Sequence, residues 1–270
     1  MSAPAGGRGP GRGRDRGGVS AHDRGVSELV GFVLVFALVV SVVAVISLAG
    51  LGTLEDVRAV EQTKNAERAM EVLSDNMADI HRRGAPSRAT EISLEGASVS
   101  LGREVQVIVR NEGAQTFLDD RVFQVRPVVY DDGDTKLVYV MGVVFRDDPR
   151  GGTVIVPYDP VVSEDRALFP VVTTVSATGD SQRIQSQTVL VRGEAVNRRV
   201  RVADTDPDRN YRNVTFNVSS PRQELWNRTL SEDAGLSCTT DDPDWVNCTL
   251  DEDPKRLFVT ETRIAVEITE

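Results

Sequence analysis

The feature that most constrains this chain is a run of 26 residues without a charged side chain, from Leu29 to Leu54. The run is dominated by Val, Leu, Ala, Ile and Phe. As a helix it would extend about 39 Å, enough to cross the roughly 30 Å hydrocarbon core of a membrane. The sequence therefore predicts a transmembrane helix, to which a buried helix of a soluble protein is the alternative.

The charges on either side of this run predict the orientation of the helix in the membrane. The segment from Met1 to Gly25 is rich in Gly, Ala, Pro and Ser and carries five arginines against two aspartates, whereas the first charges after the run are Glu55 and Asp56. Positive charge usually marks the cytoplasmic side of a membrane helix. We therefore expect the N-terminus inside the cell and everything after Leu54 outside. A cleaved signal peptide is the alternative, although its apolar stretch would span only roughly 7 to 15 residues.

Beyond the run the composition becomes polar, but the helical periodicity continues. Apolar and small side chains recur at steps of three or four, which places them on one narrow face of a helix: Val57, Val60, Thr63, Ala66, Met70, Leu73, Met77 and Ile80. Such a stripe requires a partner surface. We therefore expect an amphipathic helical stalk over residues 55–85.

The C-terminal end of this helix is marked by three kinds of signal. His81, Arg82 and Arg83 place cations at the negative pole of the helix. Gly84 suits a left-handed cap, and Pro86 prevents the helix from continuing. The sequence therefore predicts that the helix ends at Arg83.

The start of the helix is less strongly marked. If Ser27 caps it, one helix runs from Glu28 to Arg83. Gly50 and Gly52 fall near the middle of this helix, and glycine destabilises helix interiors. We expect a bend or local melting at these two residues.

After Pro86 the apolar period changes from helical to two, and turn signals separate short segments rich in Val, Ile, Thr and aromatic residues. The candidate strands are Thr90–Leu94, Glu104–Arg110, Val122–Tyr130, Lys136–Phe145, Thr153–Val156, Val171–Ala177, Arg183–Val191, Ala195–Val202, Asn213–Val218 and Leu257–Ile268. Gln223–Leu230 is a candidate short helix. Many short strands without long helices between them favour an antiparallel sandwich.

The chain thus divides into four parts: a basic leader over residues 1–25, a transmembrane helix over 26–54, a stalk over 55–85 and an extracellular β-rich domain over 86–270. The predicted fold class is α+β. It comprises a long N-terminal α-helix followed by a mainly antiparallel, β-sandwich-like head.

This order of parts resembles archaeal type IV pilins and archaellins. Haloarchaeal pilin precursors carry a junction like Arg-Gly-Val-Ser-Pro-Val-Ile-Gly, and residues 24–31 of this chain read Arg-Gly-Val-Ser-Glu-Leu-Val-Gly. The resemblance implies that a membrane prepilin peptidase cuts between Gly25 and Val26, so that the apolar helix stays in the mature protein. It also implies partners, namely membrane lipid, the peptidase and other pilin subunits.

The chain departs from the pattern at Glu28, which replaces the proline of the family's junction and would be the third residue after cleavage. Its carboxylate could pair with the new amino terminus of a neighbouring subunit, because a charge in lipid is costly without a partner. It could equally lie among lipid headgroups without a role. The head resembles no family of known function.

Two features of the expected extracellular part are typical of proteins exposed outside the cell. Four Asn-x-Ser/Thr sequons lie close together, which makes Asn213, Asn217, Asn227 and Asn247 candidates for glycosylation. Asn213 and Asn217 would face the same way if both lay on one strand. Cys238 and Cys248 are the only cysteines. We expect them to form a disulfide, which an extracellular location permits, with two free thiols as the alternative.

Other classes of function find little support. A formal net charge of −10 disfavours binding to nucleic acid through phosphates. His22 lies in the leader, and His81 is best explained as a helix-end cation; no catalytic motif or cofactor loop is present. The acids of residues 131–134 and 204–208 lack the spacing of a calcium-binding EF-hand. We expect neither catalysis nor a bound metal or cofactor.

The amino-acid composition also bears on the habitat of the organism that makes this protein. Of the 31 basic residues only Lys64, Lys136 and Lys255 are lysine, set against 41 acids. This usage resembles that of salt-loving archaea, although a GC-rich genome would also favour arginine. The leading prediction is a pilin-like protein of the cell surface, assembled as a minor pilus subunit. The alternative is an uncleaved single-pass membrane protein whose β domain binds a ligand or an envelope partner.

Overall fold

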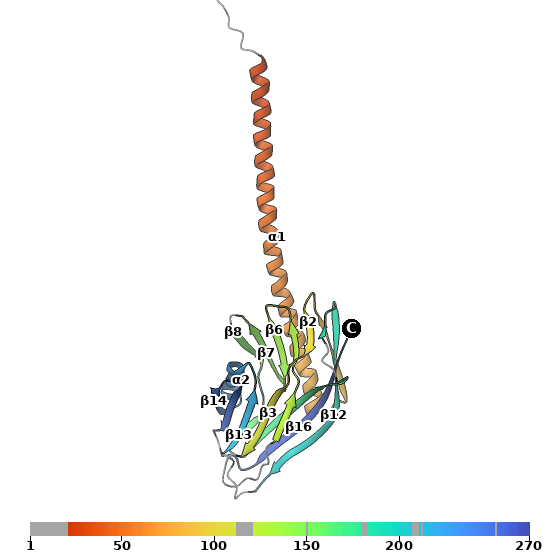
Figure 1. Ribbon diagram of the computed structural model, residues 1–270, viewed down its shortest axis with the longest axis vertical. Coiled ribbons are helices and arrows are strands. Elements are labelled where there is room, and N and C mark those ends of the chain that lie inside the picture. The colour runs from red at the N-terminus through yellow and green to blue at the C-terminus, as the bar shows by residue number, and fades with distance from the viewer. Residues whose placement is uncertain are drawn as a thin grey trace, which may run out of the picture. The chain divides into compact units, whose positions relative to one another are not determined.

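The computed structural model describes residues 21–111, 121–149, 151–179, 183–206, 211, 213–251 and 253–270, without the side chains of residues 21–27, 48–56, 59 and 111. The fold is α+β, with one long N-terminal helix followed by mostly antiparallel sheets (Figure 1). The predicted fold class is confirmed. The chain divides into two compact units, residues 1–58 and 59–270, and we call the second unit the head.

Helix α1 spans Ala21–Arg82 and therefore begins before the predicted Glu28. Ser27 lies inside the helix, so its predicted role as the N-cap is wrong. The predicted melting at Gly50 and Gly52 is also wrong, because helical backbone continues through both residues. A glycine costs a helix only about 1 kcal/mol relative to alanine, and long flanking helical stretches offset that cost.

The predicted stripe is buried over most of its length. Ala66, Met70, Leu73, Met77 and Ile80 are all at most 2% exposed, and their partner surface is the head of the same chain. The stripe does not extend to its two predicted N-terminal members, since Val57 and Val60 remain 52% and 55% exposed. The surface that covers the stripe therefore ends before the apolar periodicity of the helix does.

The helix ends as its signals predict. The backbone N–H groups of Arg83 and Ala85 both donate to the carbonyl oxygen of Asp79, at 3.1 Å. Gly84, between them, has a φ of +78°. This is the left-handed C-cap, in which glycine carries no steric penalty.

The strands described form three sheets (Figure 1). Sheet A has the order β1-β12-β16-β10-β9, with β1 Ser87–Ser93, β12 Thr188–Asp204, β16 Leu257–Thr269, β10 Arg166–Ser176 and β9 Val161–Ser163. Sheet B has the order β11-β2-β5-β6-β7-β8, with β11 Arg183–Ile184, β2 Ser98–Leu101, β5 Val128–Asp131, β6 Lys136–Val140, β7 Val143–Asp148 and β8 Gly151–Val156. Sheet C has the order β14-β15-β13-β3-β4, with β14 Leu236–Asp242, β15 Trp245–Leu250, β13 Val214–Ser219, β3 Val105–Asn111 and β4 Arg121–Val125. Among these strands, the pair β10–β16 is parallel and the others are antiparallel.

Two apolar cores lie on opposite faces of sheet B. Neighbouring residues of β6 show this, because Leu137 belongs to the core beneath the helix stripe and Val138 to the core shared with sheet C. The second core also takes in Trp226, which packs edge-on against Phe145 with ring centroids 5.2 Å apart. Trp226 comes from α2 (Gln223–Arg228), the predicted short helix, which continues into a π-helical turn, η1 (Thr229–Asp233).

Several predicted strands have different limits in the structure, for local reasons. Val122–Tyr130 is two strands in two sheets, because Pro127, which lacks an N–H, separates them. Lys136–Phe145 is a hairpin that turns at Met141 and Gly142, and methionine gives no turn signal. The strands β14 and β15 escaped prediction because their stretch is acidic and rich in turn residues.

Helix and sheet approach closely at one glycine. A Cβ atom on Gly193 of β12 would lie 2.7 Å from the sulfur of Met77 on α1 and 3.1 Å from Ile264 of β16. A side chain at this position would force the flexible end of Met77 to move. Gly193 therefore allows the stripe to pack directly on the sheet backbone.

Candidate functional site

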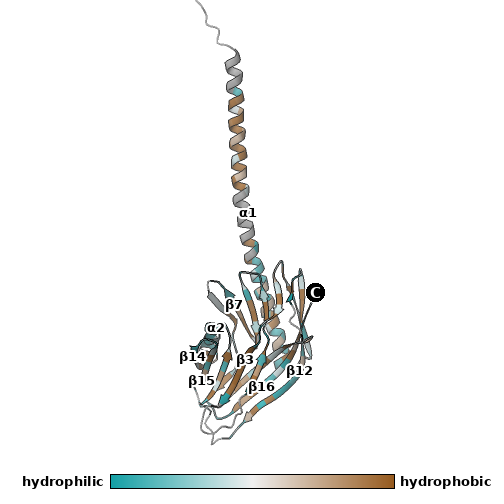
Figure 2. Cartoon of the chain, viewed as in Figure 1, coloured by the Kyte–Doolittle hydropathy of each residue, from teal (hydrophilic) through white to brown (hydrophobic). Residues whose placement is uncertain are grey.

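The first candidate site is the apolar part of α1. Residues Glu28–Ser47 form a helix long and apolar enough to cross a membrane, with a mean hydropathy of 3.2. Its large apolar side chains, from Leu29 to Ile46, are between 49% and 69% exposed. Figure 2 colours the ribbon of this stretch as hydrophobic over almost its whole length. Nothing in the described part of the chain covers it.

The predicted processing residues lie just before this stretch. The backbone of Gly25 and Val26 is helical, within the first turns of α1, and their side chains are outside the described residues. Glu28 is exposed at the start of the apolar stretch. Residues 1–20 of the predicted leader also lie outside the described part of the chain.

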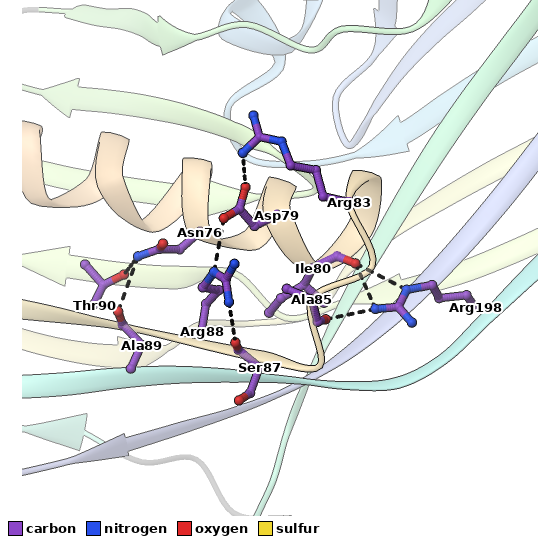
Figure 3. A network of polar contacts seen from close by, with 10 residues as sticks. All are labelled: Asn76, Asp79, Ile80, Arg83, Ala85, Ser87, Arg88, Ala89, Thr90 and Arg198. Atoms are coloured by element: carbon purple, nitrogen blue, oxygen red, sulfur yellow. Dashed lines mark hydrogen bonds and ion pairs between the residues drawn. The ribbon is translucent and has the colours of Figure 1, made fainter.

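The second candidate site is the junction between the end of α1 and sheet A (Figure 3). Asp79 accepts hydrogen bonds from Arg88 of β1, at 3.0 Å, and from Arg83. The hydrogen bond from Arg88, followed by the charges of both arginines, holds the pKa of Asp79 below its usual value. Asn76, one turn earlier, donates to the hydroxyl of Thr90 at 2.9 Å. The helix is thus tied to β1 by side chains that flank the buried stripe.

Arg198 of β12 completes this junction from the other side. Its guanidinium donates to the carbonyl oxygens of Ile80, at 3.0 Å, and Ala85, at 2.9 Å. Terminal carbonyls of a helix have no partner within the helix itself. Arg198 therefore caps the last turn and holds the chain reversal after it.

A cavity of about 270 Å³ lies beside the same helix end. Its lining includes Tyr139 and Tyr158, both buried, and Met141, which has a φ of +55°. The Tyr139 hydroxyl has no partner in hydrogen-bonding geometry among the described residues, and burial raises its pKa, against a smaller effect of the Gly142 backbone. The Tyr158 hydroxyl donates to the carbonyl of Pro170 at 3.1 Å. The cavity is thus lined by charged and polar side chains, among them Asp75, Arg82 and Asp159, together with the buried tyrosine rings.

His81 lines this cavity and is not the predicted helix-end cation. Burial, and secondarily the charge of Arg82, lower the pKa of His81 to about 4, although Asp159 opposes the shift. The ring is therefore neutral at pH 7, and its Nε2 accepts a hydrogen bond from Arg82. The prediction is wrong because the side chain is turned toward the head. Arg82, paired with Asp159 at 2.8 Å, carries the charge at this helix end.

The four sequons differ in their surroundings. Asn213 is exposed, but it precedes β13 and does not share a strand with Asn217, which is only 5% exposed. The condition under which these two would face the same way, a shared strand, is therefore not met. Asn227 lies on α2, half-buried, and its carboxamide oxygen accepts a hydrogen bond from Ser231 at 3.1 Å. Asn247 is half-exposed on β15.

The predicted disulfide is confirmed. Cys238 of β14 and Cys248 of β15 are bonded and occupy directly opposite positions of the hairpin. Cys248 is fully buried in the core shared by sheets B and C. The bond therefore links the edge strand of sheet C to its neighbour and closes the acidic turn between them.

The described acidic residues of the two clusters take part in local turns or ion pairs. Among the described residues, no group of three or more His, Cys, Asp or Glu side chains is placed to hold a metal ion. Asp132 instead accepts the backbone N–H groups of Asp134 and Thr135, which stabilises the turn between β5 and β6. Asp208, in the second acidic segment, lies outside the described residues.

No clear pattern in the sequence marks the residues of this junction. Arg198 stands among several arginines of β12, and no pattern distinguishes it from Arg199 or Arg201. Asn76 and Asp79 each precede a buried stripe residue by one position, which could have marked them as flanking the packed face. Their partners, however, come from strands whose position only the fold determines.

Comparison with known proteins gives one match. Residues 24–267 match the model of a family described as a family of unknown function (DUF7289). No curated protein and no solved structure matches the chain. The matched region starts at Arg24 and covers the apolar stretch and the head.

Proposed function

Since the chain belongs to the family of unknown function DUF7289, we propose its function from its own residues: a pilin-like protein of the cell surface. It is anchored by its N-terminal helix, cleaved by a prepilin peptidase and assembled as a minor pilus subunit with a structural or adhesive role. The observation that carries this proposal is the uncovered apolar stretch of α1, from Leu29 to Ile46. A surface that is apolar on all sides needs an apolar environment on all sides, which lipid or a bundle of like helices provides.

The residues around this stretch support cleavage with retention of the helix. The string Arg24-Gly25-Val26-Ser27 precedes it directly, and the family match begins at Arg24. Cleavage before Val26 would leave the whole apolar stretch at the new N-terminus. Gly31, Ala37 and Ala44 are small residues of the kind that allow helices to approach closely.

The packing of the second half of α1 supports a load-bearing role. The stripe from Ala66 to Ile80 is buried in the head, and the junction of Asp79, Arg88 and Arg198 ties its end to sheet A. A pull on the helix would therefore be transmitted to the head through a packed core and several charged hydrogen bonds. A subunit of a surface filament needs such a connection.

The N-terminal sequence of the protein purified from the membranes of its native host tests the proposal. We expect Val26 as the first residue, and we expect Gly25→Arg to leave the precursor uncleaved. Gly18→Arg adds the same charge within the leader and is the matched control, which should be cleaved normally. An intact leader in the wild-type protein would refute processing.

Assembly needs a second measurement, because a cleaved protein could remain a single anchored subunit. Mechanical shearing of intact cells releases filaments but not single membrane proteins. We expect the wild-type protein in the sheared fraction and the Gly25→Arg variant only in membranes. If the wild-type protein were absent from the sheared material, assembly into a pilus would be refuted, whereas membrane anchoring would still hold.

One observation favours a second candidate, an uncleaved membrane protein whose head binds a small ligand. The cavity of about 270 Å³ beside the helix end is lined by Asp75, Arg82 and Asp159 together with the rings of Tyr139 and Tyr158. Such a site would bind a small molecule that carries both polar and apolar groups. If the leader proves intact, a search for ligands with a Tyr139→Phe control would address this alternative.

A further inference from the structure

On the outer face of sheet C, which points away from its core, polar side chains lie next to one another on three adjacent strands. One row crosses all five strands as directly paired residues: Thr239, Asn247, Asn217, Ile108 and Val122. Two sequon asparagines, Asn217 and Asn247, are therefore neighbours on this face, with Cβ atoms about 5 Å apart by ordinary strand geometry. A glycan on either one would cover the other.

Burial distinguishes these two asparagines. Asn217 is 5% exposed, so a sugar on its nitrogen would have no room whether it was added before or after folding. Asn247 is half-exposed, and the hydroxyl-bearing residue of its sequon, Thr249, is exposed on the same face. Cys248 between them faces the core. This sequon therefore presents its asparagine and its threonine outward from an ordered strand.

The other two sequons are less suited to the folded protein. Asn213 is exposed, but its threonine, Thr215, is 5% exposed. In the third sequon, Asn227 is bonded to Ser231 and Thr229 is fully buried, accepting a hydrogen bond from the Tyr158 N–H. Among the sequons described, only that of Asn247 leaves both of its recognised side chains accessible.

The neighbours of Asn247 are suited to contact a sugar. Trp245, two residues earlier on the same face, is half-exposed, at a distance along the strand of about 7 Å. Aromatic rings provide an apolar surface on which a sugar ring can lie.

We propose that Asn247 carries an N-linked oligosaccharide that lies over the outer face of sheet C, against Trp245. The donor is an oligosaccharide linked through phosphate to a membrane lipid. The bond between C1 of its first sugar and the phosphate oxygen breaks, and C1 bonds to Nδ2 of Asn247. Nδ2 loses one proton, and the lipid phosphate leaves. This inference rests on the extracellular position of the head in the proposed function, but on neither cleavage nor assembly.

Glycopeptide mass spectrometry of the full chain from its native host tests the site. We expect a glycan on Asn247 and none on Asn217 or Asn227. Thr249→Ala should remove the glycan from this peptide completely, whereas Thr249→Ser preserves the sequon and should retain it. An unmodified Asn247, a glycan on Asn217, or a glycan that survives Thr249→Ala would each overturn the proposal. The same spectra show the N-terminus, so failure of processing is distinguished from failure of this inference.

The position of the glycan needs its own readout. We expect Trp245→Ala to lower the melting temperature of the glycosylated head by about 2 °C more than it lowers that of the Thr249→Ala variant, since about 1 kcal/mol shifts a domain of this size by roughly 2–4 °C. Equal shifts in the two backgrounds would show that the sugar does not contact Trp245 and would overturn this placement.

Discussion

Two stretches of the same helix have opposite surroundings. Residues 29–46 are apolar on every side, and Leu38 within them is 65% exposed, whereas in residues 66–80 a narrow stripe is apolar and Leu73 is fully buried. Polar side chains such as Glu71 and Asp75 cover the rest of the second stretch. Figure 2 shows this change of surface along α1.

The difference teaches that apolar content and burial are separate properties. A stripe of one residue per turn can be satisfied by a single surface, and here the head of the same chain provides it. A helix apolar all round cannot be satisfied by one surface, so its partner must enclose it. The two stretches of the helix thus require different surroundings, and substitutions should affect them differently.

The largest expected effect comes from the buried stretch. Leu73→Ala should lower the free energy of unfolding of the head by about 2–5 kcal/mol, because a fully buried leucine leaves a cavity. Val72, its neighbour, is 50% exposed, and Val72→Ala should change stability by less than about 0.5 kcal/mol. Chemical denaturation of the detergent-solubilised full chain measures both. Similar effects of the two variants would contradict the boundary between stripe and surface.

The second effect concerns the exposed stretch. Leu38→Asp should reduce the amount of protein in the membrane strongly, since an acid at the centre of a spanning helix costs about 2.5–3.5 kcal/mol. The melting temperature of the head should not change, because Leu38 contacts none of its core. Membrane fractionation and thermal unfolding check the two parts, with Leu38→Ala as the control. Full membrane retention of Leu38→Asp would argue against a spanning role.

A smaller effect should follow from closing the space between helix and sheet. Gly193→Ala would place a Cβ within 2.7 Å of the Met77 sulfur, and the flexible end of methionine must then move, at about 1 kcal/mol. In a Met77→Ala background the same glycine substitution should cost less. A double-mutant cycle of unfolding free energies measures the coupling. Additive effects would mean that the two residues do not constrain each other.

The smallest effect is the pH dependence due to His81. Its pKa is lowered to about 4 in the folded protein from 6.5, so the unfolded chain binds the proton more tightly between these values. Stability should therefore fall as pH drops from about 6.5 to 4, and no further below that on account of this residue. Because carboxylates also titrate there, the wild-type curve is compared with that of His81→Gln, which should be flatter. Identical curves would place His81 in solvent.

Prediction from sequence worked where a pattern was local. The stripe from Ala66 to Ile80, the cap at Gly84 and the short helix from Gln223 all follow from spacing and residue type within a few turns. It failed where residues far away in the chain determine the conformation or the burial of a side chain. Met141 adopts a positive φ in the hairpin of β6 and β7, and Asn217 is buried on the middle strand of sheet C.

The sequence by itself determined that one stretch of this protein needs an apolar environment and that a second needs one apolar partner, because hydrophobic periodicity is a property of the chain. It also determined the fold class and the pairing of its only two cysteines. The tertiary structure decided what the stripe packs against, which sequon is accessible and why His81 is neutral. Burial and charge at these sites come from segments far apart in the chain, and no local pattern encodes which of them will meet.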